Sequence, residues 1–392
     1  MSKCLIESDA EYITQNGVAY MERMQKMQIA LTKKLSDALC IKPEEINENI
    51  NPIFTWTANW TNVWTNRKTE DMLVLVNNAT RFVVAVYQVK KKDLKNIEKI
   101  LIDAIEHTLL AMNLNPEIVA EYLRQCGKIS FVKNGNRAAA SWVTSAGRDC
   151  TIHVGNMYNG IGKMFSDLVG VTTNHMIVNY SKNMKDYFYP YEKMFKKLSE
   201  LTDLPIYKYQ AYELLVTLDL KIYKAERRII VPSDMGFHEF HKVLQRAFGW
   251  KNYHLYDFMV LNKNGNEIMN LVLEDENTVF YDNTEMMEGK VLKDYLYKDR
   301  KLCYRYDFGD GWEHEIKILK VLGDYDKESP YLLEAKGQTP PEDVGGVYGF
   351  IEFLEIIKNP KHSEYEHMKQ WAGYWRENLS EWETNPRVLY EF

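Results

Sequence analysis

The feature that most restricts the fold of this chain is a set of strand-like runs joined in pairs by short turns in the C-terminal half. Apolar residues alternate with mostly polar ones over Tyr212–Ile222, which is typical of a strand with one buried face. HLYDFMVL and EIMNLVL flank Asn264–Gly265, and a second pair of runs within Leu302–Leu319 flanks Asp310–Gly311. Such dipeptides between strands are strong hairpin signals. We therefore expect an α+β fold with a mainly antiparallel sheet, because parallel strands would need longer crossover connections.

Helical spacing marks the segments around these runs. After the strand RRIIVP, Ser233 is expected to cap a helix that Gly249 ends. The apolar stripe of this helix is Phe237, Phe240, His241, Leu244 and Phe248. Phe350–Ile357 and Tyr365–Leu379 predict two further helices.

The N-terminal half predicts a second mixed set of elements. Helices are expected over 20–39, 94–112, 115–125 and 187–201, a hairpin over 72–88, and two strands around a Gly turn over 129–143. The chain has 392 residues, more than one typical core contains. We expect two domains, residues 1–203 and 204–392, with the linker near Pro205.

Composition restricts the class of protein. The net charge is −6, with 45% hydrophobic and 27% charged residues, which favours a globular protein over one that coats nucleic acid without specificity. No run approaches the roughly 18 apolar residues of a membrane span, and the start MSKCLIESDAEY lacks a signal-peptide pattern. A cytoplasmic protein with no membrane association is expected. The five cysteines form no CxxC pair, so each is expected as a buried thiol.

Two features admit a nucleic-acid interpretation. Trp56, Trp60 and Trp64 could stack bases, but spacing four also places them on one buried helix stripe or strand face. The basic run Lys90–Lys95, like Lys224, Arg227 and Arg228, is short enough to be a solvated surface.

The turn RYDFGDGW carries the main candidate site. Asp307 and Asp310 could approach one point, with His314 on the following strand, and two carboxylates with an imidazole could bind a divalent metal ion. Turn chemistry is the alternative. Asp310–Gly311 is a type I′ signal, and Asp307 can accept backbone amides in an Asx-turn.

Four other residues could complete such a site. Glu342 and Asp343 precede the helix that contains Phe350, where the helix dipole alone could explain two acids. His254 opens a strand, whereas His241 lies in an apolar stripe and fits a hydrogen-bonded core histidine better than a ligand. The chain has no GxxxxGK[ST], HExxH or GxSxG motif.

Four segments of the C-terminal half resemble one family. YRYDFGDGWEHEI, PPEDVGGVYGF, FHEFHKVLQRAFGW and HLYDF are similar to the plasmid pRiA4b ORF-3-like family, over about Tyr209 to the C-terminus. The resemblance implies matching positions for His241, His254, the turn aspartates and the PPED segment, and an association with mobile elements. The family usually has cysteines where this chain has Thr339 and Val344, so a thiolate metal site is not expected. Trp56–Arg137 is similar to a bacterial domain of unknown function.

Two functions follow from these patterns. The first is an accessory module that recognises a protein or nucleic-acid partner, with an interface at Trp371, Tyr374, Trp375 and Trp382. The second is a metal-dependent hydrolase or nuclease that uses Asp307, Asp310 and His314, completed by His241, His254, Glu342 or Asp343.

Overall fold

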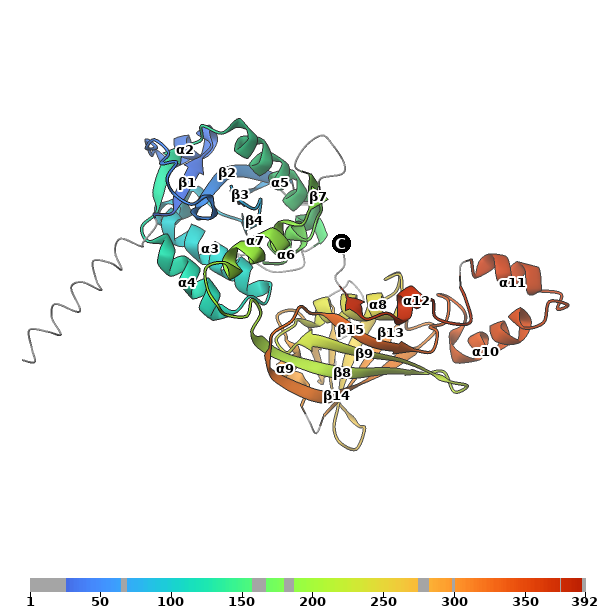
Figure 1. Cartoon of the computed structure of the whole chain (residues 1–392). Coiled ribbons are helices and arrows are strands. Elements are labelled where there is room, and N and C mark those ends of the chain that lie inside the picture. Colours follow the sequence, from blue (N-terminus) through green and yellow to red (C-terminus); the bar gives the residue numbers. More distant parts are fainter. Residues whose placement is uncertain are drawn as a thin grey trace, which may run out of the picture. The chain divides into compact units, whose positions relative to one another are not determined.

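The computed structural model describes residues 26–64, 69–156, 167–179, 187–273, 282–297, 300–373 and 375–389. The chain divides into two compact units, which meet in sequence at Lys208 and Tyr209 (Figure 1). Across the described helices, none is long and apolar enough to cross a lipid bilayer.

The N-terminal unit is built on a five-stranded sheet with the order β4-β3-β2-β1-β5. Its strands are β1 (Gln28–Leu31), β2 (Thr55–Trp64), β3 (Thr69–Asn77), β4 (Val83–Tyr87) and β5 (Ser130–Lys133). Strands β2, β3 and β4 form an antiparallel meander, whereas β1 pairs in parallel with both β2 and β5. The hairpin expected over 72–88 is confirmed.

Helices cover both faces of this sheet. One face packs on α3, α4 and α7, and the other on α5 and α6. The elements are η1 (Pro52–Phe54), α2 (Lys33–Leu39), η2 (Lys91–Asn96), α3 (Ile97–Ala111), α4 (Pro116–Cys126), α5 (Arg137–Asn156), α6 (Asp167–Asn174) and α7 (Pro190–Ser199), with a small pair β6 (Val178–Asn179) and β7 (Tyr187–Phe188). Trp56 and Trp60 are 0% and 7% exposed and lie in the core between the sheet and α3, α4 and α7. Base stacking by these two rings is therefore excluded. The side chain of Trp64 lies outside the described residues.

Two expectations for this unit are wrong. The helix expected over 20–39 is wrong at residues 28–31, which form β1, buried between two neighbouring strands; α2 begins only at Lys33, and residues 20–25 lie outside the described residues. A short apolar run of this kind has no periodicity that separates strand from helix. The second strand expected within 129–143 is the start of α5, because Asn136 Oδ1 accepts the amides of Ala138 and Ala139 and an alanine run favours a helix.

The C-terminal unit is built on a nine-stranded sheet with the order β12-β11-β10-β13-β14-β8-β9-β15-β16. The strands are β8 (Tyr209–Asp219), β9 (Lys224–Pro232), β10 (Tyr256–Leu261), β11 (Glu267–Val272), β12 (Thr284–Met286), β13 (Lys301–Tyr306), β14 (Trp312–Tyr325), β15 (Tyr331–Lys336) and β16 (Arg387–Val388). All neighbouring pairs are antiparallel except β11 with β12. The expected α+β class with a mainly antiparallel sheet is confirmed.

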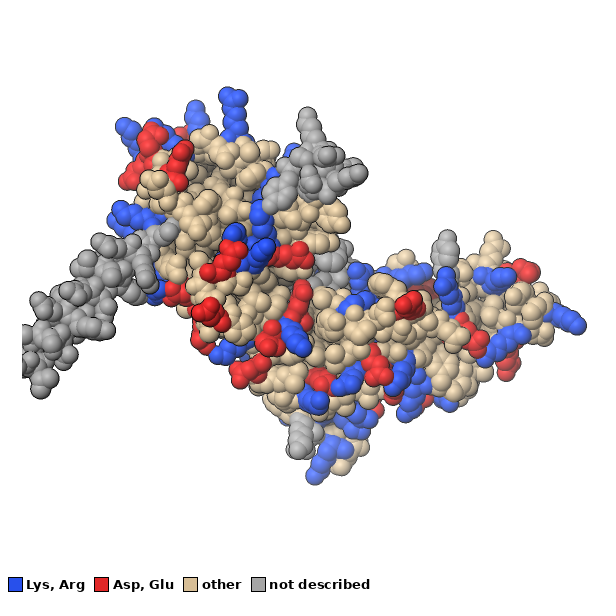
Figure 2. Space-filling model, viewed as in Figure 1, with Lys and Arg blue, Asp and Glu red and all other residues tan. Residues whose placement is uncertain are grey.

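The two faces of this sheet differ in chemistry. One face packs on α8 (Phe237–Phe248) and α10 (Gly346–Ile357) to form the core. The other face carries ion pairs between neighbouring strands, among them Asp257 with Arg305 and Glu213 with Arg228. Figure 2 shows acidic and basic side chains interspersed over this unit on the face in view, without a large patch of one sign.

Several local expectations for this unit need correction. Ser233 does not cap α8, because the helix begins at Phe237 after Gly236 and the amide of Ser233 bonds to Gln210. The helix expected over Tyr365–Leu379 ends early: α11 spans Tyr365–Trp371, Gly373 follows with φ 59°, and short helix α12 spans Glu381–Thr384. The remaining helix is α9 (Leu292–Tyr295).

Two side-chain environments also differ from expectation. Arg227, expected on a solvated surface, is 2% exposed and donates to the carbonyls of Ala247, Lys336 and Gly337. Burial lowers the pKa of this guanidinium to about 10. Among the cysteines, Cys126, Cys150 and Cys303 are buried but Cys40 is exposed, and Cys4 lies outside the described residues.

We propose that residues 204–392 fold on their own. Ahead of β8, Pro205 and Ile206 belong to no strand of this unit. The carbonyl of Pro205 accepts the side-chain amide of Asn115, and the carbonyl of Ile206 accepts its backbone amide. A fragment of residues 204–392 should therefore be soluble and unfold in one cooperative transition. Its midpoint in urea should match that of residues 209–392. A molten or insoluble fragment beside a well-folded full chain would show that the two halves share a core.

Candidate metal centre

Three loops meet at one end of the C-terminal sheet. Strand β13 lies between β10 and β14 and is antiparallel to both. The start of β10 and the β13–β14 turn therefore lie together at this end of the sheet, where Tyr256 pairs with Tyr306. His254 lies just before β10, and Asp307 directly follows β13. The segment after β15, which carries Glu342 and Asp343, reaches the same place.

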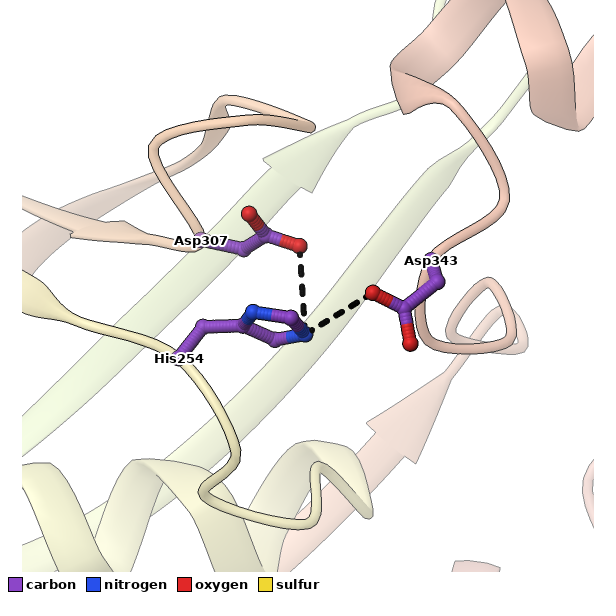
Figure 3. Close-up of side chains that lie close together, drawn as sticks. All are labelled: His254, Asp307 and Asp343. Carbon is purple, nitrogen blue, oxygen red and sulfur yellow. Dashed lines mark ion pairs between the residues drawn. The ribbon is translucent and has the colours of Figure 1, made fainter.

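Three side chains converge on one point. The Nε2 atom of His254 lies 3.5 Å from Oδ2 of Asp307 and 3.1 Å from Oδ1 of Asp343 (Figure 3). One ligand atom from each of the three residues lies within 4.8 Å of the other two. Two ligands on one cation at 2.0–2.6 Å are separated by at most about 4–5 Å, so one ion could bind all three.

Asp307 serves both the turn and the cluster. It has a left-handed φ of 57°, and its Oδ1 accepts the amides of Gly309 at 2.9 Å and Asp310 at 3.2 Å. This is the Asx-turn expected from the sequence. The second oxygen, Oδ2, faces His254. The turn and metal interpretations of Asp307 are therefore compatible, because they use different oxygens. Asp310 itself does not have positive φ, so the expected type I′ turn is replaced by a longer loop.

Glu342 is a second acid of the group with a buried side chain. Its side chain is 8% exposed, and Oε1 accepts the amide of Lys251 at 2.7 Å and the hydroxyl of Tyr306 at 3.1 Å. Its Oε2 lies 3.9 Å from His254 Nε2 and has no hydrogen-bond partner among the described residues. Burial raises the pKa of Glu342. A buried carboxylate oxygen without a donor is costly, which indicates a ligand at this point.

Backbone geometry brings the loop of Asp343 to the turn of Asp307. Asp343, Gly345 and Gly346 all have left-handed φ, of 60°, 90° and 68°. The amide of Gly345 donates to Oδ2 of Asp310 at 3.2 Å. A Cβ on Gly346 would lie 2.7 Å from the carbonyl oxygen of Asp310. This close approach requires glycine.

The grouping of Asp307, Asp310 and His314 expected from the sequence is not the one that forms. Asp310 faces Gly345, and His314 is fully buried in the core. There His314 Nε2 accepts from Trp250 Nε1 at 3.3 Å, while Nδ1 lies 3.2 Å from the carbonyl of Tyr304, which leaves neither nitrogen for a metal. Alternation along β14 turns His314 inward, away from the turn.

His241 also belongs to the core, as its apolar stripe suggested. Its Nδ1 accepts from the hydroxyl of Tyr304 and its Nε2 donates to Asn252 Oδ1, each at 2.8 Å. Burial lowers the pKa of His241 to about 3 and that of His314 to about 4. Both rings are therefore neutral at pH 7.

The cluster has an excess of negative charge. Three carboxylates surround one imidazole, so at least two negative charges remain even when His254 is protonated. Like charges at this distance repel strongly when partly buried, and a divalent cation would remove the repulsion. The donor set, carboxylate oxygens with one imidazole, suits Mn²⁺ or Zn²⁺ better than a soft metal.

Sequence comparison assigns both units to families. Residues 210–384 match the family described as "Plasmid pRiA4b ORF-3-like protein", and residues 28–193 match "Domain of unknown function (DUF6933)". The resemblances expected in the two halves are thereby confirmed.

Two relatives each match part of this chain. Uncharacterized protein y4hQ of Sinorhizobium fredii (strain NBRC 101917 / NGR234) is 39% identical over 160 residues, which are 41% of this chain and 79% of that protein. A crystal structure of a protein of unknown function, MM3350 from Methanosarcina mazei Go1, has 30% sequence identity and a TM-score of 0.39, and covers 44% of this chain and 95% of that one.

Substitution of Gly346 by alanine should separate the two loops. Left-handed backbone alone costs a non-glycine residue about 1–2 kcal/mol, and Gly346→Ala adds the clash with Asp310. The matched control is Gly265→Ala, where φ is 85° but no atom lies within 4 Å of the new Cβ. Urea denaturation of the full chain should show a larger loss of unfolding free energy for Gly346→Ala. Equal losses would contradict the close contact.

The buried neutral His314 should make stability depend on pH. Its folded pKa of about 4 lies below the unfolded value of 6.5, so its contribution is complete above pH 6.5 and is lost as the pH falls toward 4. The loss should be about 3 kcal/mol between pH 7 and pH 4. His314→Gln should reduce the wild-type slope in that range and leave the part that the buried His241 contributes, whereas the exposed control His367→Gln should keep the full slope. Parallel curves for wild type and His314→Gln would contradict the burial of a neutral ring.

Proposed function

The chain belongs, through residues 210–384, to the plasmid pRiA4b ORF-3-like family, and we propose that this unit is a divalent-cation-dependent hydrolase. The names of its relatives describe no activity, so the proposal rests on the site. The observation that carries it is the convergence of ligand atoms from His254, Asp307 and Asp343 within 4.8 Å of one another.

The ligands differ in accessibility in a way that suits turnover. The side chains of Asp307 and His254 are 8% and 25% exposed, whereas that of Asp343 is 64% exposed. Three protein ligands leave an ion with open positions for water and substrate, as in catalytic rather than structural metal sites. The exposed side of the cluster is where those positions would face.

Glu342 supplies the group that a hydrolase needs beside the ion. Its Oε1 is held by Lys251 and Tyr306, and its free Oε2 points toward His254. We assign it to accept a proton from the attacking water. The water oxygen bonds to the phosphorus or carbonyl carbon, the bond to the leaving oxygen breaks, and that oxygen takes the proton that Glu342 accepted. The ion would polarise the bond under attack and stabilise the charge that develops.

Recognition of a partner without turnover is the second candidate. The exposed rings of Trp371 and Trp382, 43% and 62%, favour it. Trp375, expected in the same interface, instead packs on Phe353 and donates to the carbonyl of Thr339. Tyr374 lies outside the described residues. Hydrolysis separates the two candidates, since only the first requires it.

Removal of one ligand charge should weaken ion binding while the turn remains. Asp307→Asn keeps an oxygen for the amides of Gly309 and Asp310, and asparagine tolerates left-handed φ. Calorimetric titration of the full chain with Mn²⁺ should show binding that Asp307→Asn weakens at least tenfold. Asp310→Asn, which removes an equal charge from the same turn, should change it far less.

Activity should follow ion binding. Nitrophenyl esters, phosphomonoesters and phosphodiesters with Mn²⁺ should include one substrate that wild type hydrolyses and that Asp307→Asn does not. Glu342→Gln should lose hydrolysis while it retains Mn²⁺. No Mn²⁺ binding by wild type would exclude the ion site, and ion binding without hydrolysis of any substrate would favour the second candidate.

A further inference from the structure

Each of the three loops that carry the ligands also exposes an aromatic ring. Tyr253 precedes His254, Phe308 follows Asp307, and Tyr348 lies in the first turn of α10 after Asp343. These rings are 69%, 53% and 74% exposed. Large rings exposed together at one site usually mark a binding surface.

Each of these rings also has a cationic group beside it. Lys251 Nζ lies 5.8 Å from the centre of the Tyr253 ring, and Arg305 Cζ lies 5.5 Å from that of Phe308. Lys221 Nζ lies 4.2 Å from the ring of Tyr348 and donates to its hydroxyl at 2.8 Å. Arg305 is also paired with Asp257, so the two lysines supply most of the available positive charge.

We propose that this site takes a single-stranded nucleic acid, whose bases stack on these rings while its phosphates meet the ion and the two lysines. The inference rests on the proposed ion site. Aromatic rings interleaved with cations are the common means of binding single strands, because every base has a face that can stack.

The ion decides whether such a ligand can approach. Without a cation the three carboxylates repel phosphate, so affinity should depend on the divalent ion as well as on the rings. Binding should therefore require both the divalent ion and the aromatic rings. A general anion site would not require the rings, and a general apolar surface would not require the ion.

Two arguments favour single strands over duplex. Bases in a duplex are stacked on one another and offer no free face to a side chain. The net charge is −6, and on the face in view in Figure 2 basic side chains are interspersed with acidic ones rather than gathered in the basic stripe that duplex binding needs.

The test uses the full chain and a fluorescein-labelled dT12 with a phosphorothioate backbone, which resists turnover. Fluorescence anisotropy should show binding in Mn²⁺, at least tenfold weaker binding in EDTA, and weaker binding of a duplex of equal length. Tyr253→Ala and Phe308→Ala should each weaken binding by fivefold or more, since stacking contributes about 1–3 kcal/mol per base. Neither variant should change the urea midpoint or Mn²⁺ affinity.

A matched control lies at the opposite end of β13. Tyr297 is 46% exposed and has Arg300 Cζ 5.1 Å from its ring, but it precedes this strand whereas Asp307 follows it. Tyr297→Ala should bind dT12 as wild type does. An equal loss in this variant would overturn the inference.

The remaining outcomes separate this inference from the proposed function. Mn²⁺ binding without dT12 binding would overturn the nucleic-acid ligand and leave the ion site standing. No Mn²⁺ binding would exclude the ion site, and this inference with it. Binding that survives EDTA, or that poly-glutamate displaces as well as unlabelled dT12 does, would also overturn it, because charge alone would then account for affinity.

Discussion

The register between β10 and β13 is the constraint on which the site depends. Asp257 pairs directly with Arg305 across the two strands, with the Asp257 side chain 3% exposed, while the next cross-strand pair, Tyr256 with Tyr306, faces the core. A slip of one residue would turn the acid into the core and the rings into solvent. The main effect of this ion pair is therefore to fix the register of β10 and β13, since an ion pair at this position adds little net stability by itself. Because this register is fixed, His254 and Asp307 must lie beside each other at the end of the sheet.

The aromatic core beneath that edge makes the acidic cluster possible. Tyr306 is 5.3 Å from Trp250 and 5.8 Å from His254, ring centre to ring centre, and its hydroxyl reaches Glu342. Burial by these rings keeps water from Glu342 and raises its pKa, so the site combines a desolvated acid with a more exposed one, Asp343. Two carboxylates in unlike environments can take unlike roles, one as ligand and one as proton acceptor.

The sequence predicted local structure better than the meeting of distant segments. Hairpins were recognised because each is determined by residues near its turn, such as Asn264–Gly265 between β10 and β11. The strand β1 was missed because its burial comes from β2 and β5, which are far away in the sequence. The site shows the same limit: Asp307 was identified from its turn, but its companion His254 was only one of several candidates. His314 was favoured as a ligand by its closeness in sequence, and strand alternation places it in the core.

The site is preorganised to different degrees around its ligands. Asp307 is fixed by two amides at its side chain and by its own amide, which donates to the carbonyl of Leu255 at 3.0 Å. The segment of Glu342 is held through Lys251 and, further back, by the buried Arg227, which bonds to the carbonyls of Lys336 and Gly337. Asp343 alone extends into solvent from a left-handed backbone. Most of the ligands are thus already in place, so the entropy lost in ordering them on ion binding would be small. The exposed ligand leaves room for exchange of water and substrate.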